Sequence, residues 1–297
     1  MVTPLAHRFI VPPFTVLNAR SSFWIQRKRL WLRYIGPMRP TAPVPLFPPI
    51  RKGNKLVHTN GGLSIFDPVL AEILIHWFCP VGGAILDPFG GEAVKGIVAA
   101  KTGREYVGVE VRRKQVEENL TIAARLGLDC RWIVGDSVHL NKLLPEMEYD
   151  FCFSSPPYYN LERYRGGDGD LSEKQSYQDF LEAYGLVLAR CANKLKPGRL
   201  LAMKVGEFRD KKGEIQGFVN DTVDMARMAG LKYFNHLALL MPLVTAPLRA
   251  AGHMRLRKVV QVHQTVLVFI KGEPRGLDRG AFPIISENYV DPLSAVE

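Results

Sequence analysis

Short apolar segments alternate with amphipathic ones through most of this 297-residue chain. The apolar segments predict β-strands at residues 84–87, 106–110, 131–135, 149–155, 200–205, 233–241 and 265–270. Amphipathic segments predict helices between several of these strands, at residues 68–78, 93–102, 113–126 and 177–195. Strands that alternate with helices favour a parallel sheet covered on both faces, so the pattern predicts an α/β fold.

The first 56 residues have a different pattern, with nine prolines and one short amphipathic segment. This segment predicts a helix over residues 22–34, with Ser21 or Ser22 as its N-cap and Pro37 beyond its end. We therefore expect three parts, which are a basic proline-rich arm over residues 1–56, a main domain over residues 57–275 and a tail over residues 276–297.

The formal net charge of +10 is concentrated in the N-terminal arm. Residues 1–66 contain ten Lys or Arg and no Asp or Glu, and residues 225–272 form a second acid-free stretch. Segregated positive charge favours a polyanionic partner, because neutralised phosphates supply most of the non-specific affinity for nucleic acid. The cationic residues expected to contact such a partner are Arg27, Lys28, Arg29, Arg249, Arg255, Arg257 and Lys258.

Two interpretations of the predicted helix in the arm remain open. Trp24 and Trp31 are interleaved with its cationic residues, which suits a nucleic-acid backbone and its bases. The same helix can equally pack its aromatic side chains on the main domain while the cationic ones stay in water. Both interpretations can hold together.

Composition and residue spacing argue against several other classes of protein. No apolar run approaches the ~20 residues that a membrane-spanning helix needs, and Pro12 and Pro13 break the apolar stretch near the N-terminus, unlike a signal peptide. The four cysteines lack CxxC spacing, which is typical of buried free thiols in a reducing cytoplasm. The histidines show no metal-ligand spacing. We therefore expect a cytoplasmic protein without a bound metal.

Three predicted strands end in residues that suit a nucleoside cofactor. Asp87 opens a turn whose glycines, Gly90 and Gly91, let the backbone approach a ligand, although tight turns use the same residues. Glu110 ends the next strand about twenty residues on, where a carboxylate can accept hydrogen bonds from both ribose hydroxyls. Asp136 ends the third strand and can accept a hydrogen bond from an adenine amino group. Ligands bind at this edge of such sheets, so the three strand ends predict one nucleoside site.

The fourth strand ends in Ser155-Pro156-Pro157-Tyr158, the most specific signal in the chain. Two prolines fix the backbone and remove its donors, so carbonyl oxygens and the Ser155 hydroxyl remain as acceptors. An exocyclic amino nitrogen is a poor nucleophile, because its lone pair is delocalised into the ring. Hydrogen bonds from both of its protons favour a pyramidal nitrogen with a localised lone pair. Tyr158 offers a face on which a base can stack after it flips out of a duplex.

These segments resemble those of the N4-cytosine and N6-adenine DNA methyltransferases. Residues 87–91 match the first half of that family's cofactor loop, DPFxGxGT, and Glu110 matches its ribose-binding acid. Residues 155–158 match its catalytic motif, (D/N/S)PP(Y/F), and residues 64–67 resemble the segment whose Phe packs on the cofactor. The chain is similar to phage or mobile-element members of the family over nearly its whole length.

The resemblance implies a Rossmann-like methyltransferase fold, with a mostly parallel seven-stranded sheet and an antiparallel terminal hairpin. It implies S-adenosylmethionine as the cofactor and double-stranded DNA as the partner. Motifs and resemblance together assign the catalytic residues as Ser155, Pro156, Pro157 and Tyr158. The residues expected at the cofactor are Phe66, Asp67, Asp87, Pro88, Phe89, Gly90, Gly91, Glu110, Asp136 and Ser137.

Ser at the first position of the catalytic motif favours cytosine N4 in this family, with adenine N6 as the alternative. A carbon-5 methyltransferase would need a nucleophilic Cys just after the Pro-Pro turn, where Tyr158 stands. A methyltransferase acting on RNA or on a protein amide stays open, as does a non-catalytic DNA-binding homologue. The departure at Glu92-Ala93-Val94 from the family's cofactor loop is the one feature that favours the non-catalytic homologue.

Only about 68 residues separate Asp87 from Ser155, so no large target-recognition domain fits between them. Recognition of a DNA sequence would fall to small elements, and a short or relaxed target site is expected. The candidates are the N-terminal arm and residues 160–175, 207–218 and 248–258.

Overall fold

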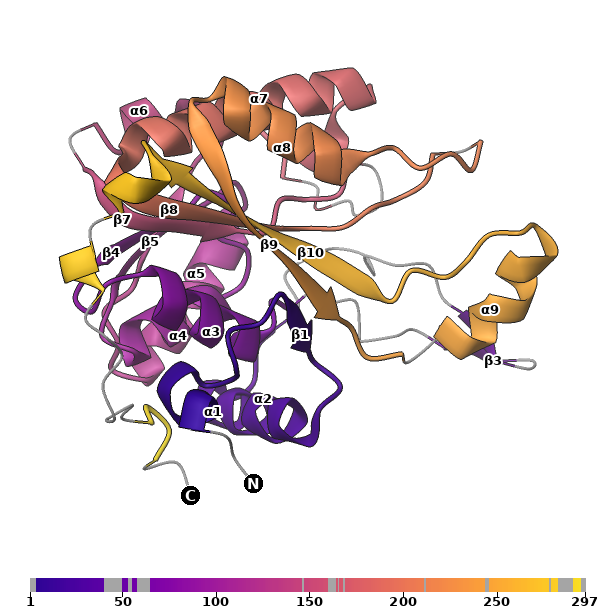
Figure 1. Ribbon diagram of the computed structural model, residues 1–297, viewed down its shortest axis with the longest axis horizontal. Coiled ribbons are helices and arrows are strands. Elements are labelled where there is room, and N and C mark those ends of the chain that lie inside the picture. The colour runs from indigo at the N-terminus through magenta and orange to yellow at the C-terminus, as the bar shows by residue number, and fades with distance from the viewer. Residues whose placement is uncertain are drawn as a thin grey trace.

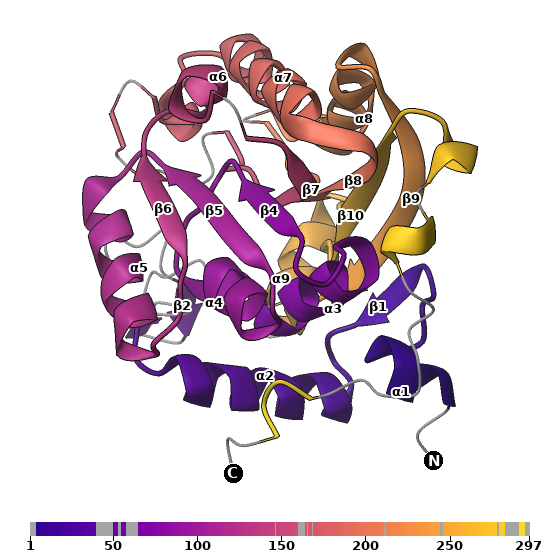
Figure 2. The ribbon, with the colours of Figure 1, turned by 90° about the vertical axis from the view of Figure 1, so that its left-hand side faces the viewer.

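The computed structural model describes residues 4–39, 50–52, 55–57, 65–145, 147–159, 164, 166–167, 169–210, 212–243, 246–277, 279–282 and 291–294. Within them, an eight-stranded sheet forms the centre of the molecule, and helices cover both of its faces (Figure 1, Figure 2). The strand order is β6 (Arg131–Val134), β5 (Glu105–Glu110), β4 (Ala84–Asp87), β7 (Tyr149–Ser154), β8 (Leu195–Val205), β10 (His263–Lys271), β9 (Leu231–Leu240) and β1 (Val16–Asn18).

Strands β6, β5, β4, β7 and β8 run parallel to one another, whereas β10 is antiparallel to both β8 and β9. This arrangement confirms the predicted mostly parallel sheet with an antiparallel hairpin at its end. β1 pairs in parallel with β9 as an eighth strand, and its three residues are too few to show a strand periodicity in the sequence. The carboxyl ends of β4, β5, β6 and β7 therefore meet at one edge of the sheet, where open α/β sheets bind ligands.

Apolar residues form a core on each face of the sheet. One core packs under α3 (Pro68–Phe78), α4 (Val94–Lys101) and α5 (Arg113–Arg125), and the other under α6 (Leu140–Leu143), α7 (Tyr177–Lys194) and α8 (Phe218–Met228). Asp67 caps α3 with Pro68 in its first turn, and Ser176 with Asp179 forms a capping box on α7. These local signals explain why both helices begin where the sequence predicts.

Helix α2 (Ser22–Ile35) packs on the outer side of α3 (Figure 2). Trp24, Trp31 and Ile35 are buried in the core that α3 shares with the sheet. The structure thus agrees with the interpretation in which the tryptophans of α2 pack on the main domain. Ser21 is the N-cap of α2, as predicted. Together with β1, α2 joins the described part of the N-terminal arm to the same body as the rest of the chain.

Helix α9 (Ala246–Arg255) follows β9 and precedes β10 in the sequence, and it projects beyond the ends of these two long strands (Figure 1). α1 (Pro4–Phe9), a hairpin of β2 (Ile50–Lys52) with β3 (Lys55–Val57), and short 3₁₀ turns are the other elements. Among the described residues, none of the helices combines the length and the apolar character needed to cross a membrane.

Candidate active site

A cavity of about 1070 Å³ opens at the carboxyl edge of the parallel strands. It runs from Asp136, after β6, past Glu110 and Tyr158 to Arg249 and His253 on α9. Its volume lies just above the range of roughly 300–1,000 Å³ that is typical of ligand pockets. One continuous cavity therefore joins the predicted cofactor residues to the predicted catalytic turn.

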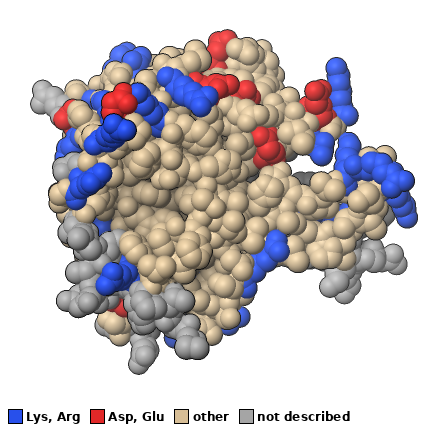
Figure 3. All heavy atoms as spheres, viewed as in Figure 1, with Lys and Arg blue, Asp and Glu red and all other residues tan. Residues whose placement is uncertain are grey.

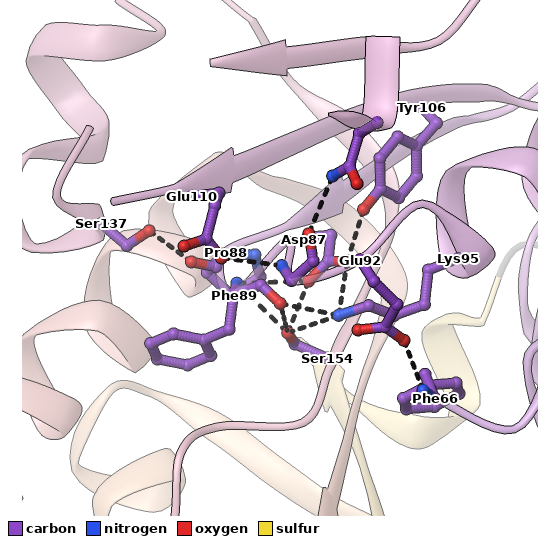
Figure 4. Close-up of polar contacts among 12 residues, drawn as sticks. Phe66, Asp87, Pro88, Phe89, Glu92, Lys95, Tyr106, Glu110, Ser137 and Ser154 are labelled. Carbon is purple, nitrogen blue, oxygen red and sulfur yellow. Dashed lines mark hydrogen bonds and ion pairs between the residues drawn. The ribbon is translucent and has the colours of Figure 1, made fainter. Parts of the chain in front are cut away.

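Asp87 is fully buried behind the wall of this cavity and braces the cofactor loop (Figure 4). Its carboxylate accepts hydrogen bonds from Ser154 Oγ at 2.5 Å and from the Tyr106 hydroxyl at 2.6 Å, and it forms an ion pair with Lys95 Nζ at 2.7 Å. Burial and the neighbouring carboxylate raise the pKa of Tyr106, so its hydroxyl stays protonated and donates. Asp87 thus bonds to three neighbouring side chains and does not line the cavity.

Glu110 lines the cavity and is held in one orientation by its own chain. Oε2 accepts the backbone N–H of Gly91 at 3.0 Å, and Oε1 accepts the N–H of Arg112 at 2.9 Å and its Nε at 3.1 Å. A carboxylate has about four acceptor sites, so this one keeps capacity to accept from a ribose hydroxyl. Gly91 has φ +53°, and a Cβ at Gly90 would lie 3.2 Å from the carbonyl oxygen of Val109. Both glycines are therefore needed to bring the loop against β5.

The third strand end contributes two different contacts. Asp136 lines the cavity, and its carboxylate accepts the N–H of Val138 at 2.9 Å. Ser137 is buried and donates to the carbonyl oxygen of Pro88 at 2.5 Å. Ser137 thereby ties the end of β6 to the cofactor loop, and the carboxylate of Asp136 is a polar group at this end of the cavity.

Phe66 forms another part of the cavity wall, between two lysines. Lys95 Nζ lies 5.4 Å and Lys204 Nζ lies 5.3 Å from the centre of its ring. The backbone N–H of Phe66 donates to Glu92, the residue that departs from the family's loop (Figure 4). Burial raises the pKa of Glu92, and the nearby Lys95 lowers it in part. Glu92 therefore fastens Phe66 to the cofactor loop.

Asp67 follows Phe66 but faces α2 and α3. Its carboxylate accepts the N–H groups of Val69 and Leu70 at the start of α3. It also accepts from Trp24 Nε1 at 3.1 Å and from Lys28 Nζ at 2.9 Å. Asp67, Asp87 and Gly90 do not line the cavity, whereas the other residues expected at the cofactor do: Phe66, Pro88, Phe89, Gly91, Glu110, Asp136 and Ser137.

All four residues of the predicted catalytic turn, Ser155 to Tyr158, line the same cavity. The chain leaves the turn through Tyr159, whose φ of +38° is rare for a side chain other than glycine. The Tyr159 hydroxyl donates to the carbonyl oxygen of Gln175 at 3.1 Å, and its ring lies against Tyr177 and Phe180. These contacts hold the end of the turn on α7.

The cationic residues expected at DNA occupy three kinds of environment. Arg27 is 6 % exposed and its guanidinium bonds to Glu72 and Asp291, so it is not available to a partner. Lys28 pairs with Asp67, and Arg29 is exposed. Arg249 lines the cavity, Arg255 and Arg257 are exposed, and Lys258 is half-buried with its Nζ over Gly213. Figure 3 shows Lys and Arg gathered over α9, at the right-hand end of this face.

Several residues of the site carry no motif in the sequence, namely Lys95, Tyr106, Ser154, Lys204 and Gln264. Lys204 interrupts the apolar strand Leu-Leu-Ala-Met-Lys-Val, and this charge was the one available signal. The four cysteines are free and buried, as expected. Within the described part of the chain, no cluster of three or more His, Cys, Asp or Glu has an arrangement that could hold a metal ion.

Comparison with solved structures finds similar folds among methyltransferases. TrmN from Thermus thermophilus is 19 % identical with a TM-score of 0.48, over 70 % of this chain and 49 % of that chain. A methyltransferase from Pyrococcus furiosus is 18 % identical with a TM-score of 0.46, over 70 % and 84 % of the two chains. This chain spans about half the length of the Thermus protein. No curated protein matches it.

A family model gives the more specific comparison. Residues 149–292 match the N6/N4 methyltransferase model, described as DNA methylase. The matched segment begins at β7 and contains the catalytic turn, α9 and β10. Residues 149–292 are therefore similar to the N4-cytosine/N6-adenine DNA methyltransferase family, as the catalytic motif predicts, and S-adenosylmethionine is the methyl donor of that family.

Proposed function

We propose that this protein is a DNA methyltransferase that transfers a methyl group from S-adenosylmethionine to an exocyclic amino group of a base. The observation that carries the proposal is that Glu110 and the Ser155–Tyr158 turn line one cavity. The first is suited to a nucleoside cofactor and the second to an amino group. Ser155 at the first position of the motif favours N4 of cytosine, with N6 of adenine as the alternative.

The residues on the cofactor side fit S-adenosylmethionine. Glu110 is oriented by Gly91 and Arg112 and would hold the ribose hydroxyls. Asp136 would accept a hydrogen bond from the adenine amino group, and Phe66, which lines the same cavity, would pack against the cofactor. When bound, this cofactor supplies an electrophilic methyl group on sulfur.

The catalytic turn prepares the amino nitrogen for attack. The Ser155 hydroxyl and the carbonyl oxygens of the Pro-Pro turn would accept hydrogen bonds from its two N–H groups. These hydrogen bonds would localise the lone pair of the nitrogen. Tyr158 would stack on the flipped base and keep the nitrogen in line with the methyl group. The proton leaves to water after transfer, so the turn needs no general base.

The cationic segment beside the cavity supports double-stranded DNA as the partner. Arg249 lines the cavity, and Arg255, Arg257 and Lys258 follow it on the same projecting element. Cations at this place would bind phosphates beside the base that enters the cavity, which makes affinity fall with salt. A small projecting element also agrees with a short or relaxed target site.

The decisive experiment expresses the protein in a bacterial host that lacks DNA methylation. Nucleoside mass spectrometry of the host DNA is expected to show N4-methylcytosine, and mapping of the modified positions gives the target sequence. N6-methyladenine would transfer the proposal to the alternative base. Preference for RNA over duplex DNA in a competition assay would contradict the DNA substrate.

Two substitutions test the assigned roles. Ser155→Ala is expected to weaken methyl transfer by about 10²-fold, because one acceptor of the amino protons is lost. Tyr158→Ala is expected to nearly abolish it, because the base loses its stacking surface. Calorimetry should show unchanged binding of S-adenosylmethionine to both variants, and full activity in both would refute the roles.

A further inference from the structure

The hydroxyl of Tyr158 is held by a side chain from the other end of the sequence. Gln264 Nε2 donates to this hydroxyl at 2.8 Å, and Lys204 Nζ donates to Gln264 Oε1 at 3.2 Å. Lys204 lies on β8 opposite Val266 of β10, and Gln264 is two residues from Val266. Alternate residues of a strand share a face, so the register of β8 with β10 brings the two side chains together.

The residue that follows β8 lies beside this hydrogen bond. A Cβ at Gly206 would lie 3.5 Å from the Tyr158 hydroxyl and 3.6 Å from Cγ of Gln264, which are ordinary van der Waals distances. Gly206 therefore packs next to both side chains. On its other side the Tyr158 ring meets Phe218 edge-on, with ring centres 6.2 Å apart. The ring is thus supported at its tip and at its edge.

Lysine determines the direction of the hydrogen bond on Tyr158. An ammonium group only donates, so Lys204 binds the oxygen end of the Gln264 amide and turns its nitrogen end toward Tyr158. The phenolic oxygen is therefore the acceptor in this bond. Without Lys204 the amide could rotate by half a turn and present its oxygen to Tyr158 instead.

The same ammonium group also touches the wall on the cofactor side. Lys204 Nζ lies 5.3 Å from the centre of the Phe66 ring. Lys204 thus contacts Phe66 directly and Tyr158 through Gln264. The two side chains that face the two halves of the cavity are linked by one lysine on the central sheet.

We propose that Gln264 and Lys204 are positioning residues that fix the plane of the Tyr158 ring for the incoming base. The proposal rests on the function proposed above, since it concerns how the catalytic turn meets its substrate. The rigid pair β8 and β10, rather than the turn itself, then sets the position of the stacking surface. Loss of either residue should lower kcat, and loss of Gln264 should leave the affinity for S-adenosylmethionine unchanged.

A double-mutant cycle between Gln264→Met and Tyr158→Phe tests the proposal. Gln264→Met keeps the length of the side chain and removes its donor, so kcat is expected to fall about tenfold, the size of one well-placed hydrogen bond. In the Tyr158→Phe background, Gln264→Met should change kcat less than about twofold, because its partner is already gone. Losses that multiply would overturn the proposal, as would a fully active Gln264→Met protein.

A second double-mutant cycle combines Lys204→Met with Gln264→Met, and kcat is measured at saturating S-adenosylmethionine. Lys204→Met should lower kcat in the wild-type background and have little further effect beside Gln264→Met. Gln178→Met serves as the control, because Gln178 makes its side-chain bond to Glu182 on the exposed face of α7. Independent effects of Lys204→Met and Gln264→Met would show that lysine does not act through the amide.

Urea unfolding of the same proteins, without cofactor or DNA, gives a readout that does not depend on activity. Gln264→Met and Tyr158→Phe are each expected to lower the unfolding midpoint, and the double variant should fall no further than the larger single effect. If the wild-type protein methylates no nucleic acid, the proposed function is wrong. Non-additive effects on the unfolding midpoint would then still establish the hydrogen bond between Gln264 and Tyr158, whereas additive effects would show that this bond does not stabilise the protein and would overturn the proposal.

Discussion

Helix α2 and the α9 segment (residues 246–258) are alike in sequence but different in the structure. Both combine several Arg or Lys with large apolar side chains and contain no acid. In α2, Arg27 is enclosed by Glu72 of α3 and Asp291 of the C-terminal tail. In the α9 segment, Arg249, Arg255, Arg257 and Lys258 have no acidic partner among the described residues.

This difference shows that the partners of a charge, rather than its density, decide what a basic segment does. Both acids that hold Arg27 come from parts of the chain far from α2. They turn a cation into a packing residue, and Trp31 Nε1 adds a third contact by donating to Glu72 at 2.8 Å. The α9 segment projects from the body, beyond the reach of such acids, and keeps its charge at the surface (Figure 1, Figure 3).

The largest expected effect concerns stability. Arg27→Met removes the cation beside Glu72, whose side chain is fully buried. Breaking a buried pair on one side leaves a charge without compensation, so the free energy of unfolding is expected to fall by about 3–5 kcal/mol. Urea denaturation followed by circular dichroism measures this change.

Arg29→Met is the matched control for that experiment, since Arg29 is exposed two residues away on α2. Its effect on the free energy of unfolding should stay within about 0.5 kcal/mol. Similar small effects of both substitutions would remove the distinction between α2 and the α9 segment.

The next effect concerns DNA binding. Arg255→Gln combined with Arg257→Gln should weaken binding to duplex DNA about tenfold or more and lower the slope of log K against log salt by up to about 2. Stability should stay unchanged, because neither side chain is buried. Fluorescence anisotropy with labelled duplex at several salt concentrations measures both quantities.

An equivalent pair on the exposed face of α2, Arg29→Gln with Arg33→Gln, tests whether α2 differs from the α9 segment in DNA binding. If α2 serves only packing, this pair leaves the salt slope unchanged. An equal loss of slope would show that the outer face of α2 also contacts DNA, in addition to packing with its inner face.

Local patterns predicted the strand ends and the catalytic turn, because these signals lie within a few consecutive residues. Ser155 to Tyr158 and Glu110 could be located at the ends of apolar strands for this reason. The contacts of Lys204 with Gln264 could not, since they depend on the register of two strands that are about 60 residues apart in sequence.

The same limit explains the residues that the structure places elsewhere. Asp87 and Asp67 belong to segments that resemble the family's motifs, but their partners Lys95, Tyr106 and Trp24 come from other elements. The sequence analysis also did not predict α8 and α9, or β1 with its three residues. Residues whose partners lie close by in the sequence were the predictable part of the site.

A smaller effect is expected when both members of the buried pair are replaced. Arg27→Met with Glu72→Leu removes two buried charges together, and such replacements are often close to neutral. The double variant should recover at least half of the stability that Arg27→Met loses, although Trp31 Nε1 and Asp291 still lose a partner. Urea denaturation of the single and double variants decides this, and a double variant less stable than Arg27→Met would contradict it.

The smallest effect is a pH dependence that only the α2 region should show. Burial alone would raise the pKa of Asp291, but hydrogen bonds from Arg27 at 2.7 Å and from the N–H of Leu293 outweigh it and lower the pKa below its usual value. A lowered folded-state pKa stabilises the fold above the ordinary Asp value of about 3.9, and this contribution is lost as pH falls further. Because the Asp291 side chain is 42 % exposed, the contribution at pH 7 should not exceed about 1 kcal/mol.

Asp291→Asn should therefore lower the free energy of unfolding slightly at pH 7, and the difference from the wild type should close below about pH 4. In the Arg27→Met background the same substitution should make a smaller difference at pH 7, because the cation is gone and only the N–H of Leu293 still lowers the pKa. Urea denaturation of the four proteins at pH 7, 5 and 3 measures this. A difference that persists at pH 3, or that is undiminished without Arg27, would mean that Asp291 stabilises the tail through Leu293 alone, and α2 would then lose its second acidic partner in the comparison with the α9 segment.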